Sequence, residues 1–112
     1  MNISDLLPFA DAPFLFWFKD EGGVYRWGNS EIQKLAKESI EGKMDRELPW
    51  AENAEDLRAH DRVAWETGKA QFLHEYVDDE TKGRITLNVC KWPGELDGQK
   101  GTFGISFRIG DE

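Results

Sequence analysis

Two long alternating segments near the end of the chain constrain its fold most. Apolar residues occupy every second position of residues 85–89, and again of residues 103–109. The segment between them is rich in Gly, Pro and Asp. Alternation predicts β-strands, and turn residues between two such runs predict a hairpin. We therefore expect two long paired strands with matched apolar faces, and we expect the rest of the chain to cover that shared face.

The preceding residues predict three more strands and three helices, joined by short irregular turns. Ser30 and Gln33 fit a capping box at the start of the first long helix, and Gly68 fits the end of the second. The predicted segments are an N-terminal helix over 2–9, strands over 14–18 and 24–28, a helix from residue 30, single helical turns over 42–50, a helix over 53–67 and a strand over 71–77. This order predicts an α+β fold, in which a five-stranded antiparallel sheet carries its helices on one face.

The first predicted strand is apolar on both faces. Phe14, Phe16 and Phe18 alternate with Leu15 and Trp17, so both sides should be covered. We assign one side to the core and the other to the N-terminal helix or a second subunit. The side chains expected at a dimer interface are Ile3, Leu6, Leu7, Phe9, Leu15 and Trp17.

Size and charge narrow the functional classes. At 112 residues with a net charge of -8, the chain fits one domain that repels phosphates, so neither nucleic acid nor an anionic membrane is an expected partner. The single cysteine excludes an internal disulfide. No signal-peptide pattern and no apolar run of about 18 residues is present. Cytoplasmic localisation is the default expectation.

The order and punctuation of these segments resemble the PAS domain family of sensory modules. The resemblance covers about residues 11–109, and the ordered set of motifs carries it rather than any single one. The matching residues are Phe18-Lys19-Asp20-Glu21-Gly22-Gly23, Tyr25-Arg26-Trp27-Gly28-Asn29, Ile40-Glu41-Gly42-Lys43, Asp61 with Glu66-Thr67-Gly68-Lys69, the hairpin from Arg84 to Ile105, and Phe107-Arg108-Ile109-Gly110.

The resemblance implies one PAS-like domain over 1–112, with a helical cap over 1–10 and a PAS core over 13–109. It implies a small-ligand sensor that feeds a histidine kinase of a two-component system, a diguanylate cyclase, a chemoreceptor or a transcription regulator, through homodimerisation and the last strand. No such effector fits within 112 residues. We therefore expect an effector on a longer chain or a partner signalling protein acting in trans.

A chamber between sheet and helices is the expected ligand site. Its predicted lining is Phe16, Trp27, Ile32, Leu35, Leu57, His60, Asp61, Ala64, Leu87, Phe103 and Ile105. Haem-binding PAS domains use a histidine on the long helix, where His60 stands, and stacked tryptophans leave non-covalent flavin open. The long helix has no cysteine, which argues against a flavin adduct. No cofactor is assigned, and no zinc-type spacing of histidine and cysteine indicates a metal.

Two alternatives remain beside the sensor hypothesis. The first is a ligand-free dimerisation module whose core is filled by its many aromatic residues. The second is a small cone-shaped enzyme that uses Asp61 and His60 as an acid–base pair, which would need a deep open pocket and perturbed pKa values. Because no third catalytic group is evident, we predict that the chain is not an enzyme.

Overall fold

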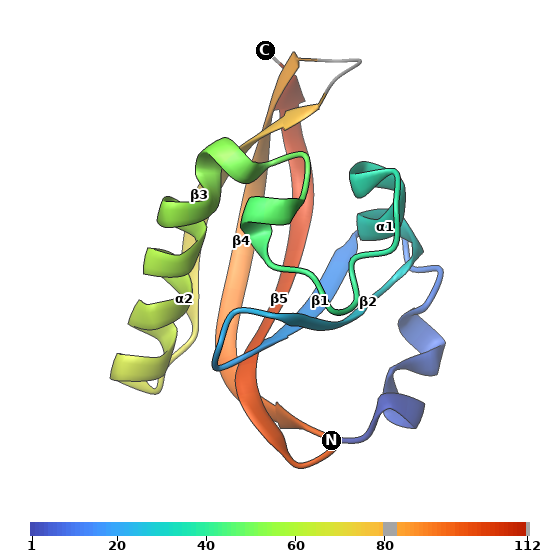
Figure 1. Cartoon of the computed structure of the whole chain (residues 1–112), viewed down its shortest axis with the longest axis vertical. Helices are drawn as coiled ribbons and strands as arrows, with labels where there is room; N and C mark the ends of the chain where they lie inside the picture. The colour runs from blue at the N-terminus through green and yellow to red at the C-terminus, as the bar shows by residue number, and fades with distance from the viewer. Residues whose placement is uncertain (80–82, 112) are drawn as a thin grey trace.

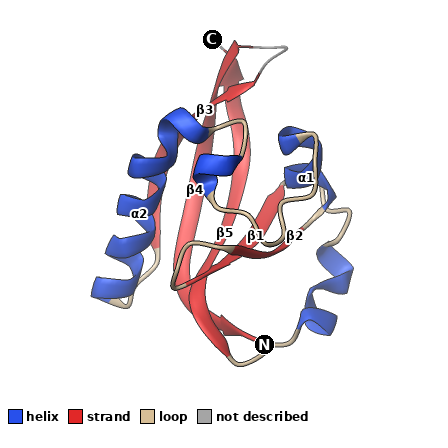
Figure 2. Ribbon diagram, viewed as in Figure 1, coloured by secondary structure: helices blue, strands red, loops and turns tan. Residues whose placement is uncertain are grey.

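A five-stranded antiparallel sheet in the order β2-β1-β5-β4-β3 is the frame of the protein (Figures 1 and 2). This computed structural model describes residues 1–79 and 83–111, so the centre of the predicted turn before the fourth strand lies outside the described residues. The strands are β1 (Leu15–Asp20), β2 (Tyr25–Gly28), β3 (Gln71–Asp79), β4 (Gly83–Leu96) and β5 (Gln99–Asp111). The predicted α+β architecture is confirmed.

Two α-helices and three short 3-10 helices join and cover the strands. They are η1 (Ile3–Phe9), α1 (Ser30–Ala36), η2 (Asp45–Glu47), η3 (Ala51–Asn53) and α2 (Ala54–Thr67). Asn29, not Ser30, caps α1, because its side chain accepts a hydrogen bond from the Ile32 amide at 3.4 Å. Gly68 ends α2 as expected, in the left-handed conformation with φ of 66°.

The β4–β5 hairpin does not match the two apolar faces as predicted. Asp97 and Gly98 both have positive φ, and they form a two-residue turn that pairs Leu96 with Gln99. The resulting register pairs Val89 with Ser106. Side chains of directly paired residues share a face, so the two apolar runs lie on opposite faces of the sheet. The expectation of one shared apolar face was therefore wrong.

Each face of the sheet consequently has its own core. The inner face is covered by α1, α2 and the segment with η2 and η3. Its buried apolar residues are Trp17, Tyr25, Ile32, Ala36, Ile40, Leu48, Trp50, Leu57, Ile85, Leu87 and Val89. The outer face is covered in part by η1, and its buried residues are Leu6, Phe16, Phe18, Leu96 and Phe103.

The start of the chain is fastened to the β4–β5 turn. The Asp97 amide donates to the Met1 carbonyl at 2.9 Å, and the Asp97 side chain accepts from the Ile3 amide at 3.2 Å. In Figure 1 the N-terminus accordingly lies beside this turn, and the C-terminus lies at the opposite end of the long hairpin. Within the described ranges, no helix has the length and apolarity needed to cross a bilayer.

Candidate functional site

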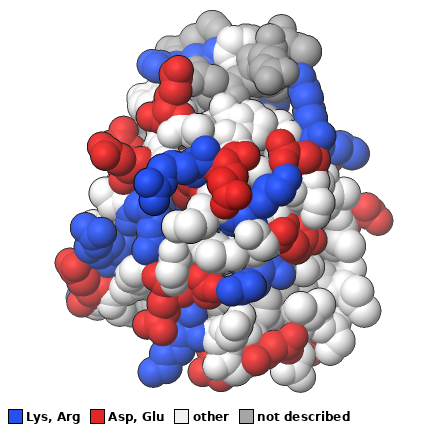
Figure 3. All heavy atoms as spheres, in the orientation of Figure 1, with Lys and Arg blue, Asp and Glu red and all other residues white. Residues whose placement is uncertain are grey.

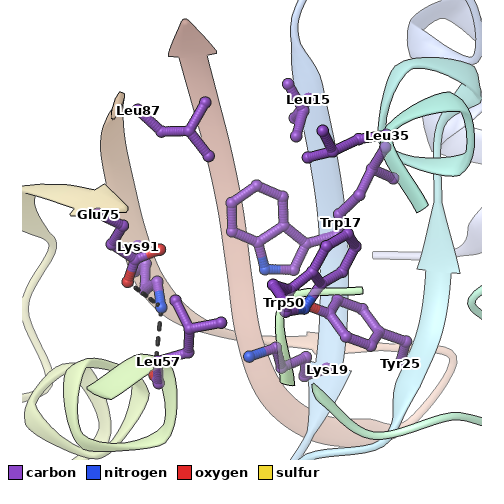
Figure 4. Close-up of a pocket in the computed structure, with 11 residues that line it drawn as sticks. Leu15, Trp17, Lys19, Tyr25, Leu35, Trp50, Leu57, Glu75, Leu87 and Lys91 are labelled. Carbon is purple, nitrogen blue, oxygen red and sulfur yellow. Dashed lines mark hydrogen bonds and ion pairs between the residues drawn. The ribbon is translucent and has the colours of Figure 1, made fainter. Parts of the chain in front are cut away.

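A small cavity lies between the inner face of the sheet and the helices that cover it (Figure 4). Its volume is about 20 Å³, enough for a single water molecule. Strands β1, β2, β3 and β4, helices α1 and α2, and the segment before η3 all contribute to its wall. The lining residues are Leu15, Trp17, Lys19, Tyr25, Ile32, Leu35, Trp50, Leu57, Glu75, Leu87 and Lys91.

Two lysines and three carboxylates form a buried ion network at this cavity. Asp61 on α2 is the centre: its Oδ2 lies 2.9 Å from Lys19 Nζ on β1, and its Oδ1 lies 2.9 Å from Lys91 Nζ on β4. Asp45 extends the network with a 2.7 Å contact to Lys19, and Glu75 with a 2.7 Å contact to Lys91. All five side chains are nearly inaccessible to solvent, so the charges are held by one another rather than by water.

Neutral donors complete the network around Asp45. The Tyr25 hydroxyl donates to Asp45 Oδ1 at 2.7 Å, and the Trp50 indole nitrogen donates to the same oxygen at 2.9 Å. At the other end, Lys91 donates to the Leu57 carbonyl at 3.3 Å as well as to its two carboxylates. The three hydrogens of the Lys91 ammonium therefore all have acceptors. Such full pairing is what makes buried charge tolerable.

The pKa values around the network follow from burial and from opposite charge. Burial favours the neutral acid of Asp61, but Lys19 and Lys91 outweigh it and hold the pKa of that carboxyl below its usual value. Burial likewise opposes the charge of Lys19, but Asp61 and Asp45 raise the pKa of its ammonium above the usual value. Burial and the neighbouring Asp45 raise the pKa of Tyr25 well above normal. At neutral pH the network therefore holds ionised Lys19 and Asp61 and a neutral phenol.

Among the described residues that line the cavity, Trp17 has the one buried side-chain polar atom without a hydrogen-bond partner. Its side chain is buried, and its Nε1 has no hydrogen-bond partner. In Figure 4 this nitrogen lies on the ring edge turned toward Lys19 and Leu57. The indole lies flat against Gly104 of β5, where an added Cβ would overlap its ring. The absence of a side chain at Gly104 thus sets the position of the Trp17 ring.

The structure brings only part of the predicted lining to the cavity. Ile32, Leu35, Leu57 and Leu87 line it. Asp61 does not line the cavity itself but forms ion pairs with two lysines that do. Ala64 is fully buried on α2 without lining the cavity. The other predicted side chains lie elsewhere.

Four predicted lining residues lie on the outer face of the sheet. They are Phe16, Trp27, Phe103 and Ile105. The two faces of β1 were assigned the wrong way round: Trp17 faces the cavity, and Phe16 packs against the cluster that contains Leu6. The sequence offered no way to orient β1, because both of its faces are apolar.

His60 points away from the cavity. Its Nδ1 lies 2.7 Å from Glu75 Oε2, its ring is 35% exposed, and it lines a separate surface groove with His74. The position of His60 therefore does not support haem ligation inside the cavity. Among the described residues we find no hydrogen bond between His60 and Asp61, and both oxygens of Asp61 are already held by lysines. This geometry does not favour the proposed acid–base pair.

Sequence reasoning placed Asp61 at the cavity but missed its charged partners Lys19, Lys91, Glu75 and Asp45. Lys91 continues the alternation of Leu87 and Val89, Glu75 is in phase with Leu73, and Asp61 lies within the apolar stripe of α2. A charged residue in phase with core positions on three different elements was the available indication of a buried ion network. Trp17 was assigned to the dimer interface, Tyr25 was matched only to a family motif, and Trp50 was considered only among the tryptophans that could stack on a flavin.

The predicted interface residues also separate into two groups. Ile3, Leu7 and Phe9 are exposed, Leu7 by 68%. Leu6 and Trp17 are covered by the chain itself, and Leu15 is partly covered at the cavity wall. Only the first group is available to another molecule.

Comparison with known families identifies the fold. The family described as "PAS fold" matches residues 9–111. The chain belongs to this family. PAS domains are sensory modules, which agrees with an internal cavity as the candidate site. Among curated protein sequences no match was found.

Solved structures share the PAS fold at low sequence identity. VqmA bound to DPO superposes with a TM-score of 0.82 at 19% identity, covering 96% of this chain and 57% of VqmA. A Vibrio cholerae VqmA–ligand–DNA complex gives the same TM-score and identity, covering 97% of this chain and 52% of that one. A PAS domain of an HTR-like protein from Haloarcula marismortui gives 0.73 at 15% identity, with coverages of 96% and 88%. The PAS domain described here thus spans little more than half of the VqmA chains.

Proposed function

We propose that this PAS domain binds a small molecule in its inner cavity and relays the binding event through β5 and a homodimer to an effector. The carrying observation is the cavity itself, which lies between the helices and the sheet over a charged floor. Its wall includes Trp17, which lies against Gly104 on β5. A ligand that displaces the indole therefore acts directly on β5, and preferential binding to one arrangement shifts the population toward it.

The similar structures support this proposal without identifying the ligand. VqmA is solved with DPO and, in another case, with a ligand and DNA. A nucleic-acid partner therefore occurs among the structural neighbours, and the absence of one here stays a prediction. It rests on the net charge of -8 and on the mixed surface of Figure 3, where basic and acidic side chains are interspersed on the face shown. The effector class is proposed as one of the four implied by the family.

Ligand retention tests the cavity proposal directly. The purified domain is analysed by native mass spectrometry, and then denatured so that any released molecule is identified. A Leu87→Phe variant fills the cavity, whereas Ile109→Phe enlarges an exposed side chain on the same sheet. We expect the first variant to lose the bound molecule and the second to keep it. No retained molecule, together with no thermal stabilisation by any member of a metabolite library, would contradict the proposal.

A homodimer through η1 is the proposed route of assembly. The exposed side chains of Ile3, Leu7 and Phe9 form an apolar surface on this helix. A VqmA dimer is among the structural neighbours. We expect Leu7→Asp to halve the mass measured by light scattering, and Val63→Asp, at an exposed apolar position on α2, to leave it unchanged. A wild-type monomer at all concentrations would exclude this interface.

A further inference from the structure

The Trp17 indole nitrogen is an unpaired donor in a site that otherwise satisfies its polar groups. Its neighbours at the cavity, Tyr25 and Trp50, both donate to Asp45. Leaving a buried donor without an acceptor is unfavourable, because the donor has lost its hydrogen bond to water and gained none in return. The Trp17 side chain is 5% exposed, and its nitrogen is fully buried without a partner. An acceptor inside the cavity would remove this cost.

We propose that the cavity selects a neutral, planar ring-sized molecule whose hydrogen-bond acceptor is held by the Trp17 indole N–H. This inference rests on the proposed ligand-binding function and names the chemistry of the ligand. The apolar wall made by Ile32, Leu57 and Leu87 contacts the faces and edges of the ring. The indole supplies direction, because a single donor in an apolar wall fixes where the acceptor must lie.

The ion network argues against a charged ligand. The carboxylates of Asp45, Asp61 and Glu75 are balanced by Lys19, Lys91 and Arg58, whose Nη1 lies 3.7 Å from Asp61 Oδ2, so the floor has no net charge that would attract an ion. A cation offers only donors, and the unpaired atom is itself a donor. The network also needs no ionic partner, since Lys91 has three acceptors and Asp61 holds a lysine on each oxygen.

The cavity must widen for a ring, and the structure shows which wall is least fixed. Leu35 on α1 and Leu15 on β1 are only partly buried, whereas Leu57 and Leu87 are fully buried. Helix α1 has seven residues and is anchored at its first turn: Asn29 accepts from the Phe16 amide at 3.1 Å and donates to the Phe14 carbonyl at 2.8 Å. The wall that carries Leu35 lies beyond this anchor, so its displacement breaks none of the ion pairs.

Benzene and pyridine test the inference, because they match in size and differ by one acceptor. Dissociation constants of both are measured by NMR titration at about pH 8, where pyridine is neutral, for the wild type, Trp17→Phe and Trp27→Phe. Trp27 lies on the outer face and serves as the matched control. The quantity of interest is the ratio of the two constants in each protein, in which the different room left by the variants cancels, and the comparison of this ratio between proteins cancels the different hydration of the probes.

We expect the preference for pyridine over benzene to fall about fivefold in Trp17→Phe, the value of one net hydrogen bond, and to stay unchanged in Trp27→Phe. In the wild type, pyridine should move the indole N–H signal of Trp17 downfield, and benzene should not. Equal ratios in all three proteins would overturn the inference while leaving ligand binding intact. Binding of neither probe would also overturn it, and the retained-molecule experiment would then decide the proposed function separately.

Discussion

The two faces of the sheet are buried by different chemistry. The inner face places Lys19, Lys91 and Glu75 among its apolar residues and closes them with Asp61 from α2. The outer face is aromatic: Phe16, Phe18 and Phe103 pack against one another and against Leu6 of η1. Its far part stays open to solvent, and Phe72 there is 79% exposed.

This difference separates the two tasks of the domain. Aromatic packing on the outer face contributes stability through buried area and tolerates small shifts, because it is non-directional. Hydrogen-bonded ion pairs on the inner face have narrow geometry, and they lose much of their value when one partner moves. A cavity bounded by such pairs keeps a defined shape, which suits selective binding. The comparison predicts that the two faces respond differently to matched substitutions.

The largest expected effect comes from the centre of the ion network. Asp61→Asn keeps the shape of the side chain but leaves two buried ammonium groups short of negative charge, and we expect a loss of about 3–5 kcal/mol in the free energy of unfolding. Asp56→Asn, on the exposed side of the same helix, should cost less than about 1 kcal/mol. Urea denaturation of both variants measures the contrast. Equal losses would mean that the network contributes nothing beyond helix stability.

Removal of the outer cover should be the next largest effect. Leu6→Ala deletes a fully buried side chain from the aromatic cluster, and we expect a loss of about 2–4 kcal/mol. Leu7→Ala, on the same helix but exposed, should change stability by less than about 0.5 kcal/mol in the monomer. If ligand affinity also fell in Leu6→Ala, the two faces would not be independent.

Gly104→Ala should act on the inner face with a smaller cost. The added Cβ overlaps the Trp17 indole, so the ring must move into the cavity, and overpacking of this kind costs about 1–3 kcal/mol. We expect lower thermal stability together with weaker ligand binding. Gly42→Ala is not a suitable control, because its φ is 84°, but Gly22→Ala adds a methyl group at a solvent-exposed turn. Unchanged binding in Gly104→Ala would show that the indole does not border the ligand.

Changes of pH near neutrality should have the smallest effect on the free energy of unfolding. Because the folded pKa of Asp61 is lowered, its contribution is complete above its unfolded pKa, near 3.8, and is lost as the pH falls through the lower folded value. Lys19 has a raised pKa, so its contribution is complete below its model value of 10.5 and is lost as the pH rises through the higher folded value. We expect both contributions to be complete between about pH 5 and 9. Chemical denaturation of the wild type and of Asp61→Asn across pH 2–12 measures them, and a difference between the two proteins that changes within this window would contradict the prediction.

Local sequence patterns predicted the helices and strands well. They predicted poorly which face of the sheet the side chains of each strand occupy. The strands, the long helix with its Gly68 end and the β4–β5 hairpin followed from alternation, periodicity and turn residues. The facing of the hairpin did not, because the two-residue turn at Asp97–Gly98 sets the register, and a shift of one residue exchanges the faces. The same uncertainty reversed β1. Asp61 was placed at the site because it interrupts the apolar stripe of α2, but its lysine partners come from strands distant in sequence.

Asp61 has one further consequence, because its two lysines stand on β1 and β4, which flank β5 in the sheet. Helix α2 is thereby tied across β5 to strands on either side of it, and Trp65 on the same helix donates to Thr102 of β5 itself. A helix tethered to three adjacent strands resists rocking in either direction, since each tilt stretches one of its tethers. Any mechanical yielding of this domain is therefore directed to the opposite rim, where α1 packs against β1.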